Sequence, residues 1–206
     1  MQHIKNVIFD LGGVIMNLHF DRTYDAFNEL IGQDFKEIFA QHKQDPVIDQ
    51  YETGRSTTEE FRDGLREMFG LPQLADDAID KAWNAMLGDI PKERIEFVKK
   101  VGKEKRVFLL SNTNALHKTY FDKVYSDTVG GGDIEELFEQ AYYSHTSHDR
   151  KPNVSIFQMV CHENELKPSE TVFIDDTLQH VEGARKAGLE AIHLQLPTTI
   201  LDLGLI

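Results

Sequence analysis

The strongest constraint on the fold is a short apolar run near the amino terminus that ends in an aspartate. The run spans residues 7–9 (Val-Ile-Phe), and Asp10 follows at once. A continuous apolar run is typical of a strand that is buried on both faces of a parallel sheet. Gly12 and Gly13 then allow a tight turn and a close approach of the backbone to a ligand. We therefore expect Asp10 at the carboxyl end of a central strand, where open α/β sheets bind ligands; a simple turn cap is the alternative.

A long segment with helical periodicity follows this turn, from about residue 17 to 88, and it contains no convincing strand. Its first apolar residues recur at spacings of three and four, as on one face of a helix, at Phe20, Tyr24, Phe27 and Ile31. Two overlapping capping boxes, Ser56 with Glu59 and Thr57 with Glu60, indicate the start of a later helix. The segment is therefore predicted to be an all-helical insertion.

Four more apolar runs of strand length occur beyond residue 89, and helical patterns separate them. They lie at residues 106–111, 140–144, 171–174 and 191–194. Strands that alternate with helices form right-handed βαβ units and a parallel sheet. We therefore predict an α/β fold with a Rossmann-like parallel sheet of strand order 3-2-1-4-5. The predicted core comprises residues 1–16 and 89–206, and the helical insertion comprises residues 17–88.

Polar side chains stand at or just beyond the carboxyl ends of four of these strands. They are Asp10, Ser111, Lys151, Asp175 and Asp176. All carboxyl ends of a parallel sheet share one edge, and the strand order places Asp10 beside Asp175 and Asp176. Three unpaired carboxylates would repel one another, and a hard divalent cation such as Mg²⁺ removes that conflict. The pattern favours a Mg²⁺ site with a serine and a lysine nearby, which suits an anionic phosphoryl group.

Composition excludes several classes of partner. The chain of 206 residues has 22 Lys and Arg against 35 Asp and Glu, a net charge of −13 that repels nucleic acid and anionic membranes. A single cysteine, Cys161, excludes an intramolecular disulfide and suits a reducing cytoplasm. The amino terminus lacks the layout of a signal peptide, and no apolar run approaches the ~20 residues of a membrane helix. We expect a cytoplasmic protein that binds neither nucleic acid nor membranes; no pattern assigns an oligomeric state.

The motifs at the strand ends resemble those of the haloacid dehalogenase superfamily. They are Asp10-Leu11-Gly12, Ser111-Asn112, Lys151-Pro152 and Asp175-Asp176, in the superfamily's order and on the expected elements. The resemblance covers essentially the whole chain and is greatest to small bacterial sugar-phosphate phosphatases with an Asp-Leu-Gly opening. It implies that the helical insertion is a cap. It also implies Mg²⁺-dependent hydrolysis of a small phosphorylated metabolite, such as a sugar phosphate, through an aspartyl-phosphate.

The resemblance further implies a role for each acidic residue of the site. Asp10 would be the nucleophile and a metal ligand. Asp176 would bind Mg²⁺ directly, and Asp175 would assist through water. The backbone carbonyl of Gly12 would complete the ligands that the chain supplies.

The phosphate-binding groups are likewise implied by the resemblance. Ser111 and Lys151 would hold the phosphoryl oxygens, and the backbone N–H groups of Leu11 and Asn112 would add donors. Lys151 would also act in catalysis, because its charge and that of Mg²⁺ together offset the charge of the nucleophile and the phosphate.

One position departs from the superfamily's phosphatases, which usually carry a second Asp two residues after the nucleophile as general acid and base. Gly12 occupies that position here, and a positioned acid or base typically contributes ~10²–10⁴ in rate. One hypothesis is that a nearby group or water replaces it, with help from His19 or Asp21, both close in sequence to Asp10. The departure also leaves open a phosphomutase, a 2-haloacid dehalogenase, or a non-catalytic relative that binds a phosphorylated ligand.

Overall fold

The fold is that of a computed structural model, which describes residues 3–41 and 46–206. Five strands form one parallel sheet of order β3-β2-β1-β4-β5, so the predicted α/β fold and strand order are confirmed. The strands are β1 (Asn6–Phe9), β2 (Arg106–Ser111), β3 (Gln140–Tyr143), β4 (Thr171–Asp175) and β5 (Glu190–His193). The central strand β1 sets Phe9 opposite Leu109 on one side and Ile174 on the other.

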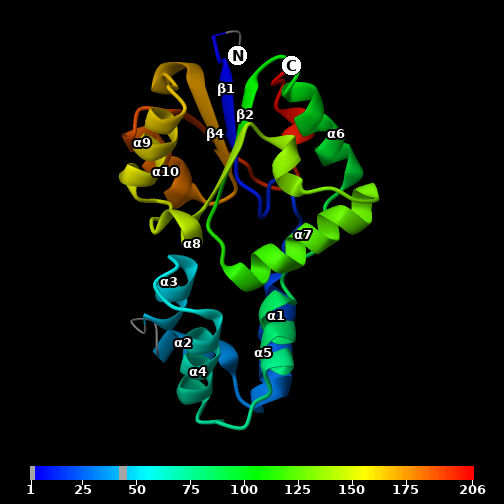
Figure 1. Ribbon diagram of the computed structural model, residues 1–206, viewed down its shortest axis with the longest axis vertical. Coiled ribbons are helices and arrows are strands. Elements are labelled where there is room, and N and C mark those ends of the chain that lie inside the picture. The colour runs from blue at the N-terminus through cyan, green and yellow to red at the C-terminus, as the bar shows by residue number, and fades with distance from the viewer. Residues whose placement is uncertain (1–2, 42–45) are drawn as a thin grey trace.

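Helices cover both faces of this sheet (Figure 1). One face packs on α6 (Lys92–Val101) and α7 (Ala115–Val129), and the other on α9 (Val154–Glu163) and α10 (Leu178–Lys186). Short helical elements complete this part: α8 (Ser144–Ser147), η1 (Ile134–Leu137), η2 (Pro168–Glu170) and η3 (Ile200–Asp202). Within the described ranges, no helix combines the length and the apolar character that crossing a membrane requires.

The side chains of β1 alternate between two apolar cores, as a strand buried on both faces requires. Val7 and Phe9 lie in the core beneath α6 and α7. Ile8 points the opposite way and lies in the core beneath α9 and α10. This double burial fixes the strand firmly, and with it the position of the residue that follows.

The helices between β1 and α6 form a separate group with its own core, here called the helical module. They are α1 (Phe20–Ile31), α2 (Phe35–Gln41), α3 (Val47–Glu52), α4 (Thr58–Phe69) and α5 (Asp76–Asn84). Aromatic side chains build this core, with the Phe27 and Phe35 rings stacked 4.6 Å apart. Of the two predicted capping boxes, only that of Thr57 and Glu60 forms, because α4 begins after Thr57; the Ser56 hydroxyl is buried with no partner among the described residues.

Two short chain segments join the helical module to the sheet, and they lie side by side. Leu18 and Leu87 form an antiparallel bridge. The N–H of His19 donates to the carbonyl of Met86 at 2.8 Å. The module therefore leaves and rejoins the rest of the protein at one place, and Figure 1 shows it at the end of the molecule opposite both termini.

Candidate active site

Three carboxylates meet where β1 and β4 end. Asp10, Asp175 and Asp176 each offer an oxygen that lies within 4.8 Å of the oxygens offered by the other two. Asp10 and Asp175 are buried, and Asp176 is partly exposed. The convergence predicted from the strand order is therefore present in the structure.

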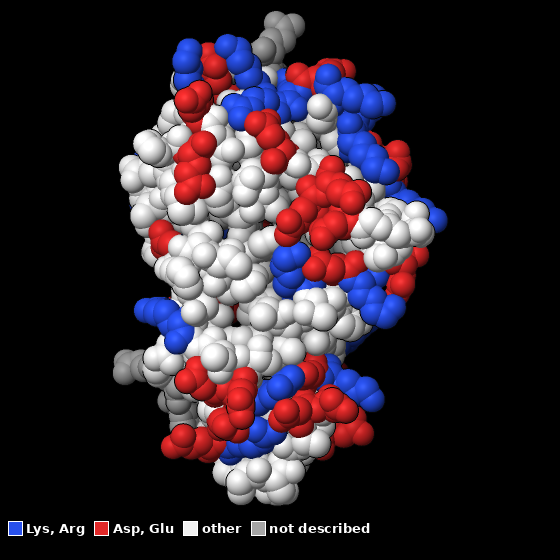
Figure 2. Space-filling model, viewed as in Figure 1, with Lys and Arg blue, Asp and Glu red and all other residues white. Residues whose placement is uncertain are grey.

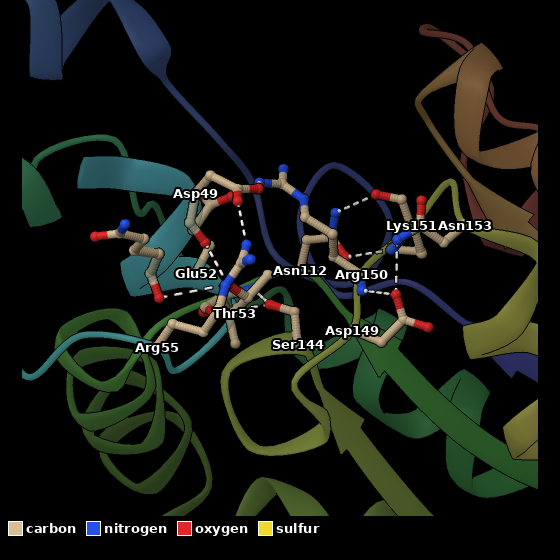
Figure 3. A network of polar contacts seen from close by, with 12 residues as sticks. Asp49, Glu52, Thr53, Arg55, Asn112, Ser144, Asp149, Arg150, Lys151 and Asn153 are labelled. Atoms are coloured by element: carbon tan, nitrogen blue, oxygen red, sulfur yellow. Dashed lines mark hydrogen bonds and ion pairs between the residues drawn. The ribbon is translucent and has the colours of Figure 1, made fainter. Parts of the chain in front are cut away.

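A fully buried lysine bridges two of these carboxylates. The Lys151 Nζ lies 2.8 Å from the Asp10 Oδ1 and 2.7 Å from the Asp175 Oδ2. The side chain of Asn112 holds the lysine's backbone, because its Nδ2 donates to the Lys151 carbonyl at 2.9 Å and its Oδ1 accepts from the Lys151 N–H at 3.0 Å (Figure 3). The Asn112 side chain therefore positions Lys151, a role that sequence reasoning did not identify.

The electrostatics of the cluster favour an additional cation. Burial, followed by the charge of Asp175, raises the pKa of Asp10 to about 8 even though Lys151 opposes the shift. Burial and the charge of Asp175 also raise the pKa of Asp176. One lysine therefore does not offset the negative charge gathered here, and oxygen ligands of this kind suit a hard divalent cation.

Asp175 differs from the other two carboxylates because its oxygens already have partners. Burial alone would raise its pKa, but the charge of Lys151 and the hydrogen bond and charge of His180 outweigh burial and hold that pKa well below its usual range. Its Oδ1 accepts from the Thr177 N–H at 2.8 Å, and the His180 Nδ1 lies 3.1 Å from both oxygens. His180 was missed in the sequence, where the only signal was its place in the first turn of the helix after Asp175-Asp176.

A cavity of about 370 Å³ opens beside the cluster, between the sheet and the helical module. Its lining includes all the sequence-predicted site residues except Asp175, namely Asp10, Leu11, Gly12, Ser111, Asn112, Lys151 and Asp176. A larger groove of about 1160 Å³ lies at the amino ends of the strands, around Lys5 and Arg106, and contains none of these residues. The smaller cavity is therefore the candidate active site, and its volume suits a small ligand.

Several polar groups at the cavity's inner end have no partner. Within the described residues, the Ser111 hydroxyl and the backbone N–H groups of Leu11 and Asn112 make no hydrogen bond, and the Gly12 carbonyl accepts none. Buried or half-buried polar groups are normally satisfied. Three hydrogen-bond donors without partners lie beside Lys151 and can bind an anion. The carbonyl without a partner can bind a cation next to it.

The two glycines after Asp10 are held by close contacts. A Cβ on Gly12 would lie 2.7 Å from the Leu18 Cδ1, so Leu18 fills the space that a side chain at position 12 would enter. Gly13 has a φ of +71°, and its Cβ would lie 2.0 Å from the Asp176 Oδ2. The turn therefore requires glycine at position 13 and excludes a carboxylate at position 12 without repacking of Leu18.

The outer part of the cavity is lined by the helical module and by α7. Most of its lining is apolar, from Phe20, Tyr24, Phe35, Ile48, Trp83, Met86, Leu87 and Phe121. Glu52 lines it as well, whereas His19 and Asp21 do not. The hypothesis that either of these two helps to replace the acid missing at Gly12 thus finds no support in their placement.

The sheet with its covering helices and the cavity at its carboxyl edge together define a Rossmann-like α/β enzyme core. A family model for haloacid dehalogenase-like hydrolases matches residues 4–188. The protein therefore belongs to the haloacid dehalogenase-like hydrolase family.

Two curated relatives are phosphatases. D-ribitol-5-phosphate phosphatase from Bacteroides thetaiotaomicron is 26% identical over 187 residues, which cover 91% of this chain and 90% of the relative. Phosphorylated carbohydrates phosphatase from Thermotoga maritima is 24% identical over 197 residues, which cover 92% and 84%. The similarity to both therefore extends well beyond the motifs.

A similar solved structure is that of a HAD family enzyme from Bacteroides thetaiotaomicron in complex with magnesium and inorganic phosphate. It is 34% identical to this chain, with a TM-score of 0.85, and the match covers 96% of this chain and 97% of the other. The likeness thus includes the helical module as well as the sheet.

Proposed function

We propose that the protein is a Mg²⁺-dependent phosphatase that hydrolyses a small phosphorylated carbohydrate. The main observation behind the proposal is the position of Asp10, which contacts the buried Lys151 and lies close to Asp176. These residues line a cavity whose inner end has several hydrogen-bond donors without partners among the described residues. The relatives that act on phosphorylated carbohydrates support the substrate class, and the relative solved with magnesium and phosphate supports the cofactor.

The acidic cluster fits a magnesium ion. Asp10, Asp176 and the Gly12 carbonyl would hold it, because they line the cavity, whereas Asp175 is occupied by Lys151 and His180 and would assist through water. When bound, Mg²⁺ offsets the negative charge of the phosphoryl group and of the carboxylates around it.

The chain's own groups supply the chemistry. The Asp10 carboxylate attacks phosphorus, the bond to the leaving oxygen breaks, and that oxygen takes up a proton from water. Water then hydrolyses the aspartyl-phosphate, which returns Asp10 and releases inorganic phosphate. Lys151, the Ser111 hydroxyl and the N–H groups of Leu11 and Asn112 hold the phosphoryl oxygens and stabilise their charge in both steps.

The helical module would serve as the cap of this enzyme, with residues 17–88 as cap and residues 1–16 and 89–206 as catalytic core. Apolar side chains of the module line the outer part of the cavity, so closure excludes water from the phosphoryl group. On the face seen in Figure 2, uncharged side chains make up the middle of the band where the two parts meet. We also propose a cytoplasmic location, because a single buried cysteine that forms no disulfide suits a reducing compartment.

Phosphate release is the direct test. With Mg²⁺, the enzyme is expected to hydrolyse para-nitrophenyl phosphate and members of a panel of sugar phosphates, and a chelator should abolish turnover. Halide release from a 2-haloacid without metal would instead establish a dehalogenase. Isomerisation of a sugar phosphate without phosphate release would establish a mutase. Absence of turnover in a folded protein that binds Mg²⁺ would favour the non-catalytic alternative.

Replacement of Gly13 by alanine is expected to abolish Mg²⁺ binding. The new methyl group would overlap the Asp176 Oδ2, and alanine is strained at a φ of +71°. Isothermal titration with Mg²⁺ measures the effect, and circular dichroism checks the fold. The matched control is Gly70→Ala at the end of α4, where φ is +65° but no atom lies within 4 Å of the new Cβ. Equal Mg²⁺ affinity in Gly13→Ala and the control would contradict the assignment of Asp176.

A further inference from the structure

The outer part of the cavity contains one acidic side chain from the helical module. Glu52, the last residue of α3, lines the cavity together with mostly apolar and aromatic side chains. Its side chain is 20% exposed. A ligand whose phosphate lies at Asp10 would therefore direct the rest of its structure toward aromatic walls and one carboxylate.

No free cation accompanies that carboxylate among the described residues that line the cavity. Lys151 is the only lysine or arginine there, and Asp10 and Asp175 hold it at the inner end. His117 also lines the cavity, but burial lowers its pKa to about 4, so its ring is neutral near pH 7. His180 lines the cavity too, but its Nδ1 lies 3.1 Å from both oxygens of Asp175, which holds this ring at the inner end. The outer part of the cavity therefore offers an acceptor for hydroxyl groups and, among the described residues, no cation that is free to pair with a second anion.

Contacts with the loop after α8 fix the position of Glu52 (Figure 3). Its Oε2 lies 2.8 Å from the Arg150 Nη1, and Arg150 also contacts Asp49 at 3.3 Å. The next residues are held as well, because the Thr53 carbonyl lies 3.1 Å from the His148 Nδ1. Arg150 is thus occupied by two carboxylates of α3 and lies outside the cavity lining. Burial raises the pKa of Glu52, and the charge of Arg150 opposes that shift.

We propose that Glu52 determines which leaving group the enzyme accepts. Its carboxylate accepts hydrogen bonds from hydroxyl groups of the leaving alcohol, while the aromatic walls pack against carbon faces of that alcohol. The same negative charge repels a second phosphate or a carboxylate on the leaving group. The preferred substrates are therefore monophosphate esters of uncharged polyhydroxylated alcohols, and bisphosphates are poor substrates. This inference rests on the proposed phosphatase function.

The test compares two esters that differ by one phosphate, fructose 6-phosphate and fructose 1,6-bisphosphate. The quantity measured is the ratio of their kcat/KM values or, for an ester that is not turned over, of their inhibition constants against para-nitrophenyl phosphate hydrolysis. Wild type is expected to favour the monophosphate. Glu52→Gln should lower that preference about tenfold or more, because a charge-assisted hydrogen bond and a repulsion are lost together. Glu52→Ala should shift the preference in the same direction.

The matched control is Asp49→Asn. Asp49 is on the same helix and contacts the same arginine, but it does not line the cavity. This variant removes the same unit of charge, and its preference is expected to stay within about twofold of wild type. A wild-type preference for the bisphosphate, or equal shifts in Glu52→Gln and Asp49→Asn, would overturn the role of Glu52. Failure of wild type to hydrolyse para-nitrophenyl phosphate with Mg²⁺ would instead overturn the proposed function itself.

Discussion

The phosphatase activity of the variant Asp10→Asn is expected to be more than about 10³-fold lower than that of wild type, because an amide cannot act as the nucleophile that forms an aspartyl-phosphate. Steady-state hydrolysis of para-nitrophenyl phosphate with saturating Mg²⁺ measures the loss. Asn is nearly isosteric with Asp, and its side chain can still accept a hydrogen bond from the Lys151 Nζ, which lies 2.8 Å from the Asp10 Oδ1. The loss is therefore expected without disruption of the site.

Stability supplies a second readout for the same variant. In the metal-free protein the pKa of Asp10 is raised to about 8 from an ordinary value of 3.8, so the folded state holds a proton that the unfolded state releases. The stability of wild type should therefore fall as the pH rises from about 4 to about 8. Asn does not titrate. The Tm of Asp10→Asn minus that of wild type, measured with a chelator, should therefore increase as the pH rises from about 4 to about 8.

Two results would contradict this account of Asp10. Residual activity within tenfold of wild type would show that Asp10 is not the nucleophile. A Tm difference that is constant between pH 5 and pH 8 would show that burial does not oppose the charge of this carboxylate. The matched control is Asp89→Asn, which changes an exposed aspartate that accepts a hydrogen bond from the Asn17 side chain at 2.9 Å.

The fold and the inner part of the candidate site could be predicted from sequence because local signals determine them. An apolar run such as residues 7–9 indicates a strand buried on both faces, and the shared edge of a parallel sheet brings distant strand ends together. The pairing of Asp10 with Asp176 follows from strand order alone. Lys151 was predicted to lie close to these residues, but its complete burial between two carboxylates was not.

The outer part of the candidate site could not be predicted, because it depends on packing between segments that are distant in sequence. Glu52 enters the cavity only because α3 rests on the loop that contains Arg150, almost a hundred residues later. His19 and Asp21 are close to Asp10 in sequence, yet neither lines the cavity, although Phe20 between them does. Proximity along the chain was therefore a poor guide to proximity in the site.

The absence of an acid at Gly12 is linked to the packing of its neighbours. The Leu18 side chain occupies the space that a side chain at position 12 would need, and Leu18 also pairs with Leu87 where the helical module joins the core. An aspartate there would require the end of the Leu18 side chain to move, whereas the bridge between Leu18 and Leu87 is made by the backbone. Where the superfamily's usual pattern has an acid, this protein therefore has the Leu18 side chain packed against the turn.

Replacement of Lys151 by methionine is expected to lower the free energy of unfolding of the metal-free protein by about 3–5 kcal/mol at pH 7, because the buried side chains of Asp10 and Asp175 lose the lysine that contacts both. Phosphatase activity should be lost as well. Chemical denaturation with a chelator present measures the change in stability. The exposed pair of Lys123 and Asp127, 2.6 Å apart, provides the control: Lys123→Met should cost less than about 1 kcal/mol.

The pH dependence of this loss distinguishes an electrostatic cause from a packing defect. In wild type the pKa of Asp175 is held below its usual range, so its contribution to stability is present above the unfolded value and is lost as the pH falls. Without Lys151, burial raises that pKa instead, and protonation at low pH relieves the cost. The stability gap between wild type and Lys151→Met should therefore narrow steadily from pH 8 to pH 5. A gap that stays constant over this range would show that the lost lysine stem, rather than its charge, destabilises the variant.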